Sequence, residues 1–368
     1  MAKTTILVAG ASGVVGQGVL TVLAGAPDCE VIAVSRRAPV DLCGARHVAA
    51  DLNDEAQCRE LFGGMHEVTH VVYAALYEKP GLVAGWLEQE QIETNERMLR
   101  NLFEPLAAAA RNLRHVTLLQ GTKAYGVHVR PLTIPARENR SEMHEQPNFY
   151  WKQEDYLRDK QAGSSWHWTI LRPQIIFGLS TGSAMNLIPA LGTYAALLRE
   201  GGEPLVYPGG PGNILEAVDA DLLGRVIVWA GRAEAAQNEI FNVTNGDVYM
   251  WQNIWPALAE MLGMAPGPAV PCSLGETMPK RAEEWAAICK KYDLLAPDIS
   301  RFVGESFNYA DFCMAYGAEG FGVAPAIVST VKLRQAGFCE AMDTEDMFRK
   351  WFREFERRRL LPPVSGKR

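Results

Sequence analysis

Short, largely apolar runs alternate with longer amphipathic segments along the first half of the chain. Such runs occur at 6–9, 30–34, 47–50, 68–75 and 115–119. Runs of this length are too short for helices and are typical of buried parallel strands. Between the last two runs, the segment 88–110 has the length and pattern of a long helix. The alternation predicts an α/β fold with a parallel, doubly wound sheet and right-handed crossovers.

A glycine-rich loop follows the first apolar run. Its glycines have the spacing G-x-x-G-x-x-G, and a helix-like apolar segment comes after it. One glycine permits the tight turn, one lets the backbone approach a pyrophosphate, and one lets the helix pack on the strand. The helix N-terminus then favours an anion. The motif predicts a dinucleotide site rather than a plain strand–helix turn, made by Gly10, Ser12, Gly13, Val14, Val15 and Gly16.

The end of the second strand indicates which dinucleotide is bound. Ser35, Arg36 and Arg37 come directly after it, where a carboxylate would bind the ribose hydroxyls of NAD. A hydroxyl and two guanidinium groups suit a 2′-phosphate instead. The sequence therefore favours NADPH, and the alternative interpretation is a solvated basic turn.

The residues that follow the other strands are further cofactor candidates, because ligands of doubly wound sheets lie beyond the carboxyl ends of the strands. Asp51 either meets the adenine amino group or caps a helix that begins near Asn53. Small side chains after the fourth strand would let the backbone come close to the cofactor. The candidates at these strand ends are Asp51, Leu52, Ala74, Ala75 and Gln120.

The elements define a Rossmann-type domain over residues 1–178, with further core elements expected from 213–245. Residues 179–368 are expected to form mainly a smaller, mostly helical substrate-binding region and C-terminal helices. The runs 201–212 and 264–272, rich in glycine, proline and small residues, are predicted to be loops. An aromatic group in an apparently irregular region suits a lid over an apolar substrate or ordinary packing, and comprises Trp285, Phe302, Phe307, Tyr309 and Phe312.

Three tyrosines compete for a catalytic role. Tyr156 fits the Tyr-x-x-x-Lys spacing of short-chain dehydrogenases, but within a segment typical of a solvated helix face. Tyr150 begins the same helix, where a catalytic tyrosine is expected, and has Glu154 instead of a lysine four residues later. Tyr125 is too close along the chain to face Lys123 reliably. Because a tyrosine acid works best beside a cation, Lys123 from a different element is the candidate partner of Tyr150.

With this displaced lysine, the chain resembles the progesterone 5β-reductase and iridoid synthase-like family, an atypical branch of the short-chain dehydrogenases/reductases. The resemblance rests on G-T-K-A-Y at 121–125 and on N-F-Y at 148–150, and continues through 171–178, 184–187 and 241–248. It implies the extended short-chain dehydrogenase/reductase architecture with Lys123 and Tyr150 as catalytic residues. Where the family often has a second tyrosine, this chain has Trp151.

The resemblance further implies reduction of a C=C bond that is conjugated to a carbonyl group, with NADPH as the hydride source. Tyr150 would hold the enolate oxygen, and Lys123 would supply positive charge. Residues expected near the nicotinamide are Pro173, Ile175 and Ile176. The substrate-contact candidates are Phe149, Trp151, Met185 and Phe307.

Other functions stay open at this point. They are carbonyl reduction, a sugar-nucleotide epimerase or dehydratase of the extended type, and a non-catalytic NADP-sensing protein. The absence of a lysine four residues after Tyr150 counts against an epimerase or dehydratase. The presence of both Lys123 and Tyr150 counts against a sensor that has lost its chemistry.

Composition narrows the partners and the compartment. A net charge of −7 argues against nucleic acid or an anionic membrane as the main partner. Seven scattered cysteines without a C-x-x-C pair predict reduced thiols and no metal. With no apolar run of transmembrane length and no signal-like segment, we expect a cytoplasmic enzyme with a small apolar enone or enal substrate, possible as a homodimer.

Overall fold

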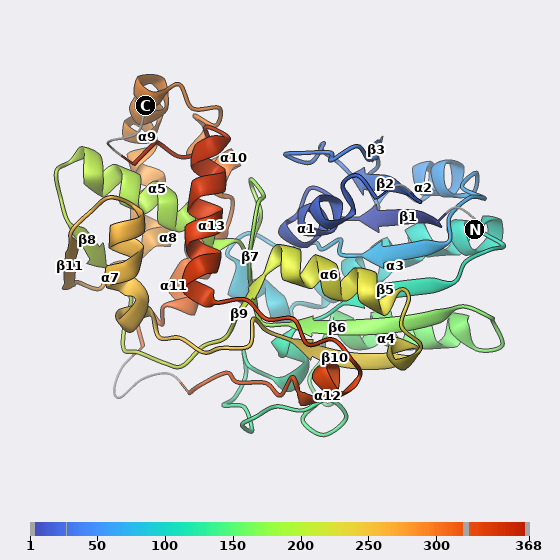
Figure 1. The fold of residues 1–368 in the computed structure, drawn as a ribbon. Helices are drawn as coiled ribbons and strands as arrows, with labels where there is room; N and C mark the ends of the chain where they lie inside the picture. Colours follow the sequence, from blue (N-terminus) through green and yellow to red (C-terminus); the bar gives the residue numbers. More distant parts are fainter. Residues whose placement is uncertain (1–3, 27, 319–323, 365–368) are drawn as a thin grey trace. The chain divides into compact units, whose positions relative to one another are not determined.

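A parallel sheet organises the first part of the chain. The computed structural model describes residues 4–26, 28–318 and 324–364, and within them a seven-stranded sheet has the spatial order β10-β6-β5-β4-β1-β2-β3 (Figure 1). All of its neighbouring strands pair in parallel. The strands are β1 (Thr4–Ala9), β2 (Cys29–Ser35), β3 (Arg46–Ala49), β4 (His70–Tyr73), β5 (His115–Leu119), β6 (His167–Pro173) and β10 (Glu239–Val243). The predicted doubly wound fold is confirmed.

Helices cover both faces of this sheet. The helices α2 (Glu55–Phe62), α3 (Gln89–Ala109) and α4 (Phe149–Gln161) share one hydrophobic core with strand residues such as Leu7, Val71 and Val116. Side chains alternate along a strand, so the intervening strand residues face the other side. There α1 (Val14–Leu23) packs against α6 (Ala220–Ala230). Short helices complete this part: η1 (Leu82–Leu87), η2 (Thr122–Tyr125), η3 (Glu234–Ala236) and α12 (Val331–Gln335).

The chain divides into two units. The first comprises the described residues up to Gln174 together with Ala220–Thr244 and Val328–Glu340, and therefore contains the whole parallel sheet. A backbone bridge between Ala136 and Val328 ties its last segment to the long connection after β5. The second comprises Ile175–Asp219, Asn245–Ile327 and Ala341–Arg368, as far as these residues are described.

The second unit is mostly helical. Its helices are α5 (Leu187–Glu200), α7 (Trp251–Met261), α8 (Leu274–Thr277), η4 (Met278–Arg281), α9 (Ala282–Tyr292), α10 (Ile299–Val303), α11 (Ser306–Cys313) and α13 (Thr344–Arg357). Two small parallel pairs join β7 (Ile175–Phe177) to β9 (Ala217–Asp219) and β8 (Leu205–Tyr207) to β11 (Pro266–Ala269). The predicted loops at 201–212 and 264–272 are therefore wrong in part, because each contains a strand that pairs with the other.

The aromatic group at 285–312 lies on helices, not in an irregular region. Trp285 and Phe302 are fully buried, and their rings stack with centroids 5.5 Å apart. These two residues belong to the core of the second unit. Among the described helices, none combines the length and the apolar character that crossing a bilayer requires.

Candidate active site

The glycine loop after β1 forms a cradle at the start of α1. Gly10 has φ +80°, and a Cβ on it would lie 2.6 Å from the carbonyl carbon of Ala74, so the loop packs on the Ala74–Ala75 backbone. A Cβ on Gly16 would lie 2.4 Å from the Gly10 oxygen, which shows how closely the helix approaches the loop. Gly13 is the N-cap of α1, with no side-chain cap and no acidic residue in the first turn. The helix N-terminus is thus available to an anion.

The other predicted loop residues surround this helix start. Val14 is buried, whereas Ser12, Gly13 and Val15 are half-buried. Ala74 and Ala75 follow β4 and are also half-buried. These residues, which the sequence places far apart, therefore come together at the carboxyl ends of β1 and β4.

The basic turn after β2 consists of Ser35, Arg36 and Arg37, of which Ser35 makes a contact within the turn. The Ser35 hydroxyl donates to the Arg37 carbonyl at 2.6 Å, and His47 Nε2 lies 3.3 Å from the same hydroxyl. Arg36 and Arg37 are exposed and form no hydrogen bond or ion pair through their guanidinium groups with the described residues. Two adjacent guanidinium groups without carboxylate partners suit a phosphate.

The carboxylate of Asp51 does not cap a helix. It accepts from the Asn53 backbone at 3.0 Å, whereas Asp54 is the N-cap of α2 and accepts from Gln57 N at 2.9 Å. The alternative interpretation of Asp51 as a cap is therefore wrong, because the helix starts at Glu55 and its N-cap is Asp54. Leu52 is buried, and its carbonyl accepts from Asn101 Nδ2 at 2.8 Å.

Tyr150 lies in the first turn of α4, where the Asn148 side chain accepts from its backbone N–H at 3.1 Å. A Cβ on Gly121 would lie 3.2 Å from the Tyr150 hydroxyl, so the missing side chain at Gly121 leaves room for that oxygen. The hydroxyl has no hydrogen bond to the part of the chain that the structure describes. The carbonyl of Pro173, at the end of β6, lies on the same side of Gly121.

Lys123 lies in η2, directly after β5, and is buried in an aromatic setting. Its Nζ lies 4.5 Å from the centre of the Trp86 ring, 5.3 Å from that of Phe149 and 5.7 Å from that of Tyr150. Phe149 and Tyr150 pack edge to face at 4.6 Å. The structure thus brings together the two catalytic candidates, Lys123 and Tyr150, and one substrate-contact candidate, Phe149.

Glu78 is a member of this site that sequence reasoning missed. Its carboxylate lies 3.4 Å from Lys123 Nζ and accepts from Trp86 Nε1 at 3.0 Å and from Gln91 Nε2 at 2.6 Å. The Glu78 side chain is only 4% exposed. No local pattern marks this residue, because its partner Lys123 is 45 positions away along the chain.

Burial and Glu78 set the charge state of the site. Burial lowers the pKa of Lys123, and the Glu78 carboxylate offsets part of that effect. Burial raises the pKa of Tyr150 above its usual range, and Glu78 adds to the rise. His128, whose ring meets Trp86 at 5.9 Å, has its pKa lowered to about 4 by burial and by Lys123. Tyr150 is therefore a protonated hydrogen-bond donor at neutral pH.

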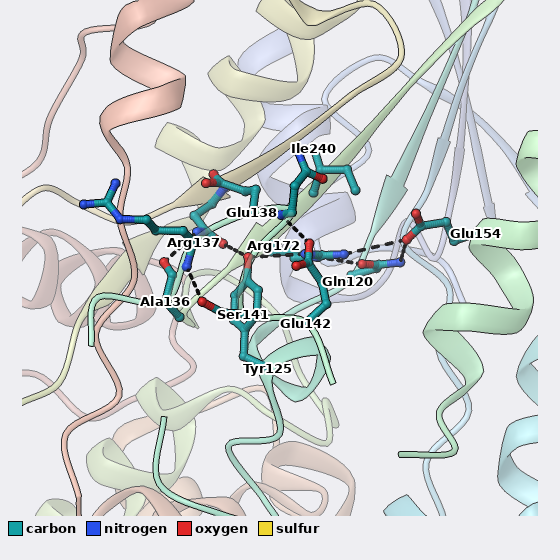
Figure 2. Close-up of polar contacts among 12 residues, drawn as sticks. Gln120, Tyr125, Ala136, Arg137, Glu138, Ser141, Glu142, Glu154, Arg172 and Ile240 are labelled. Carbon is teal, nitrogen blue, oxygen red and sulfur yellow. Dashed lines mark hydrogen bonds and ion pairs between the residues drawn. The ribbon is translucent and has the colours of Figure 1, made fainter. Parts of the chain in front are cut away.

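Arg172 in β6 is the centre of a second polar group (Figure 2). Its guanidinium donates to Gln120 Oε1 at 2.8 Å, to Glu142 Oε1 at 2.8 Å and to the Tyr125 hydroxyl at 3.3 Å, with the Glu154 carboxylate at 3.7 Å. Gln120 in turn donates to Glu154 Oε2 at 3.0 Å. The amide oxygen and the amide nitrogen of Gln120 are thus both hydrogen-bonded within the protein.

This Arg172 group extends into the connection between β5 and α4. The Tyr125 hydroxyl donates to Asn242 Oδ1 at 2.6 Å, and the Asn242 backbone donates to Glu138 at 2.6 Å. Asn242 Nδ2 reaches the carbonyls of Ala136 and Ser329. The long connection that leads to Tyr150 is therefore tied to β6 and β10 by buried polar contacts.

Tyr156 faces a different environment from Tyr150. It belongs to the core shared with α3, its hydroxyl lies 3.5 Å from Glu104, and Arg100 lies 4.4 Å over its ring. The segment was expected to be a solvated helix face, which is wrong for Tyr156 because its ring is buried against α3. Lys160 Nζ lies 5.6 Å from the centre of the Tyr156 ring, but unlike Lys123 this lysine is exposed and pairs with Glu104 at 3.2 Å.

Trp151 packs beside the Tyr150 turn. Its ring lies 4.3 Å from that of His144, and its indole N–H donates to the Gln146 carbonyl at 3.1 Å. It also contacts the small cluster formed by Ile92, Ala124, Phe149 and Tyr150. The indole nitrogen is thus satisfied by the protein.

The remaining candidates belong to the second unit. Ile175 is buried and Ile176 half-buried in β7. The Asn186 backbone donates to Ser306 Oγ at 3.0 Å, which brings the adjacent residues Met185 and Phe307 into one neighbourhood of that unit. Phe307 is buried in α11, and Met185 is half-buried before α5. Among the residues with described positions, no group of His, Cys, Asp or Glu could hold a metal ion.

The doubly wound sheet with its glycine cradle, together with the relatives named below, identifies an oxidoreductase of the short-chain dehydrogenase/reductase class. Residues 6–316 match the family profile described as the PRISE-like Rossmann-fold domain, and the chain belongs to this family. The resemblance inferred from the motifs at 121–125 and 148–150 is thereby confirmed.

Curated relatives agree with this assignment. The chain is 31% identical to an (S)-8-oxocitronellyl enol synthase of Catharanthus roseus, over 84% of this chain and 82% of that protein. It is 30% identical to a 3-oxo-Δ(4,5)-steroid 5-beta-reductase of Arabidopsis thaliana, over 98% of this chain and 94% of that protein.

Solved structures confirm the extended architecture. A UDP-glucose 4-epimerase from Bifidobacterium longum, in complex with NAD+ and UDP, has a TM-score of 0.67 at 17% identity, covering 96% of this chain and 98% of that one. The corresponding epimerase from Thermotoga maritima, with UDP-glucose, has a TM-score of 0.66 at 18% identity, covering 95% and 99%. At these identities the likeness concerns the fold alone.

Proposed function

We propose that this chain is an NADPH-dependent reductase of C=C bonds conjugated to a carbonyl group. The observation that carries the proposal is the buried Lys123 beside Tyr150, whose hydroxyl over Gly121 has no hydrogen bond to the described residues. A hydrogen-bond donor and a nearby cation at the carboxyl end of a strand suit a substrate oxygen that gains negative charge. The names of the curated relatives, an enol synthase and a 3-oxo-steroid reductase, support this chemistry.

The residues of the first unit fit a dinucleotide. The cradle at Gly10 and Gly16 would be filled by any Cβ, and the α1 N-terminus has no side-chain cap. The guanidinium groups of Arg36 and Arg37 have no partner among the described residues and suit a 2′-phosphate. In this proposal the glycine loop holds the pyrophosphate, Asp51 and Leu52 lie near the adenine, and the residues at 173–176 lie near the nicotinamide. When bound, the reduced nicotinamide supplies a hydride.

The chain's own residues would stabilise the oxygen of the substrate. Because the pKa of Tyr150 is raised, its hydroxyl stays protonated and donates to the carbonyl oxygen as that oxygen becomes an enolate. Lys123 adds positive charge to the same region, and the rings of Trp86 and Phe149 exclude water from it. Met185 and Phe307 stay predictions for substrate contact.

The epimerase and dehydratase alternative is not favoured. The residue at the position of their helical lysine is Glu154, and its carboxylate pairs with Arg158 at 2.7 Å and lies 3.7 Å from Arg172. This position therefore serves the Arg172 group and cannot assist Tyr150.

An assay with simple enones tests the function. We expect the purified chain to oxidise NADPH in the presence of methyl vinyl ketone or 2-cyclohexen-1-one, with the saturated ketone as product. Product analysis by gas chromatography distinguishes this 1,4-reduction from formation of the allylic alcohol. Allylic alcohol as the main product would establish carbonyl reduction instead, and the absence of turnover across a panel of enones and enals would refute the proposal.

Replacement of the basic turn tests the cofactor. We expect Arg36→Ala and Arg37→Ala each to weaken NADPH binding about tenfold to a hundredfold, since each removes a charge-assisted phosphate contact of about 1.5–3 kcal/mol. NADH binding should change little, because NADH has no 2′-phosphate. Dissociation constants from fluorescence titration measure both effects. Arg46→Ala, which removes an exposed guanidinium from the amino end of β3, opposite Ile32 and away from this turn, is the control. Equal affinity of the unmutated protein for NADH and NADPH would contradict the assignment.

A further inference from the structure

A row of histidines crosses the amino-terminal edge of the sheet. His70, His115 and His167 are the first residues of β4, β5 and β6, and they pair in register across these neighbouring strands. Residues in register on parallel strands face the same side of the sheet. The rings of His70 and His115 lie 6.4 Å apart. This side is the one covered by α1 and α6, opposite the core of α2, α3 and α4.

The histidines line a cavity of about 640 Å³ within the first unit. Its apolar wall comes from β1, α1 and α6 and includes Ile6, Leu23 and Ile227. Its polar side includes the guanidinium-bearing residues Arg111, Arg114 and Arg232. Among the described residues that line this cavity, none is aspartate or glutamate. The lining is therefore basic, although the chain as a whole carries a net charge of −7.

The cations of this cavity have no carboxylate partners. Arg111 and Arg114 form no ion pair with the described residues, and Arg232 Nη2 only approaches Cys29 Sγ, at 3.9 Å. Exposed arginines without partners are common, but three around one cavity create a local positive potential. That potential favours an anion.

His115 gives a second, independent indication of a ligand. It is 4% exposed, and its Nε2 is buried without a hydrogen-bond partner in the described residues. Burial, with His70 and His167, lowers the pKa of His115 to about 3, so the ring is neutral. Burial lowers the pKa of His70 as well, and Arg114 and Arg232 act in the same direction. A buried ring nitrogen without a partner is costly, and a polar ligand in the cavity would satisfy it.

We propose that this cavity binds a small organic anion, with a phosphate or carboxylate head at Arg114, Arg232 and His115 and an apolar body against the wall formed by Ile6, Leu23 and Ile227. Guanidinium groups bind both head groups bidentately, and the apolar wall selects a ligand with a hydrocarbon part. Lys123 and the glycine loop follow the carboxyl ends of β5 and β1, whereas the histidines begin their strands. The cavity is therefore separate from the candidate active site and does not depend on the proposed function.

Calorimetric titration with defined probes tests this proposal. The probes are hexyl phosphate, hexanoate and uncharged hexanol, each added to the full chain with saturating NADP+ so that the predicted dinucleotide site does not compete. We expect saturable binding of at least one anion and none of hexanol. The tighter of the two anions identifies the head group as a phosphate ester or a carboxylate. The double variant Arg114→Gln/Arg232→Gln should weaken the anion at least about tenfold.

A matched double variant controls for charge. Arg140→Gln/Arg353→Gln removes the same charge from exposed positions outside the cavity and outside the predicted dinucleotide site, and should leave probe binding within about twofold. NMR of isotope-labelled histidine rings provides a second measurement that needs no variant. The resonances of His70, His115 and His167 should shift on saturation, while that of His144, whose ring lies beside Trp151, should not. Absence of saturable anion binding, equal binding of hexanol, or equal weakening by both double variants would overturn the proposal.

Discussion

Two buried cations lie near the carboxyl ends of neighbouring strands, and the protein holds them in different ways. Arg172 in β6 is fully buried and donates to Gln120, Tyr125 and Glu142 at 2.8–3.3 Å (Figure 2). Lys123 after β5 is 9% exposed, and among the described residues its only carboxylate neighbour is Glu78 at 3.4 Å. The rest of its surroundings are aromatic rings.

The difference separates a structural cation from a reactive one. A guanidinium has five donors in a fixed plane and stays charged, so it can join several segments permanently. An ammonium is compact, and its pKa responds to burial and to one carboxylate. Most of the hydrogen-bonding capacity of Arg172 is used by the fold, whereas that of Lys123 is left for a ligand.

Removal of Arg172 should give the largest effect, and it should act on stability. Arg172→Leu leaves Glu142 buried without its cation, whereas Glu154 keeps Arg158, so we expect the free energy of unfolding to fall by about 3–5 kcal/mol. Urea unfolding followed by circular dichroism measures the loss. A change below about 1 kcal/mol would show that the Arg172 group does not hold the connection to α4.

Lys123→Met is the matched variant at the other cation. Glu78 keeps its hydrogen bonds from Trp86 and Gln91, so the loss of stability should be smaller, about 1–2 kcal/mol. Enone reduction and NADPH binding should fall together in this variant, in contrast to a purely structural change. If Lys123→Met were the less stable of the two variants, the comparison between the two cations would be reversed.

The sequence predicted what depends on local pattern. Apolar runs gave the strands close to their observed bounds, as for 115–119, and the glycine spacing located the cradle at Gly10 and Gly16. The motif at 148–150 placed Tyr150 correctly in the first turn of α4, because Asn148 caps that helix. These features are set by residues that are close together along the chain.

Features that depend on distant contacts were missed. Glu78 pairs with Lys123, and Glu142 with Arg172, across 45 and 30 positions, so nothing near either glutamate in the sequence reveals its role. The strands β8 and β11 lie in runs with turn-forming composition, but each gains a partner in the other, and tertiary pairing outweighs local propensity. The helices at 285–312 were missed because they are short and rich in aromatic residues, so that their helical periodicity is hard to recognise in the sequence.

The two tyrosines of α4, Tyr150 and Tyr156, test the catalytic role of the Lys123 site. Tyr150→Phe removes only a hydroxyl without a partner in the described residues, so stability should hardly change. As the loss of one oxyanion donor, it should lower kcat/KM for an enone by about 10²–10³-fold. Steady-state NADPH oxidation measures this. Tyr156→Phe is the control, with near-normal activity and loss of the contact with Glu104. An inactive Tyr156→Phe variant would contradict the assignment of Tyr150.

Glu78→Gln should give the smallest effect, and it tests why Lys123 remains a usable cation. The Glu78 carboxylate opposes the effect of burial on Lys123 and reinforces the effect of burial on Tyr150. Without this charge, the pKa values of both Lys123 and Tyr150 should fall. The proposed mechanism needs both groups protonated, so activity is present below these pKa values and lost above them.

The lower pKa values of Lys123 and Tyr150 set the direction in which the pH profile of Glu78→Gln moves. The alkaline limb of the pH profile of kcat/KM should move to lower pH in Glu78→Gln, while activity at neutral pH falls by less than about tenfold, because the amide oxygen still accepts from Trp86 Nε1 and Gln91 Nε2. Glu104→Gln, which removes a carboxylate beside Tyr156, should leave the profile unchanged. A shift to higher pH would contradict the assigned charge interactions, because loss of the Glu78 carboxylate should lower both pKa values. An unmoved limb would mean that Glu78 only packs against Trp86 without tuning the site.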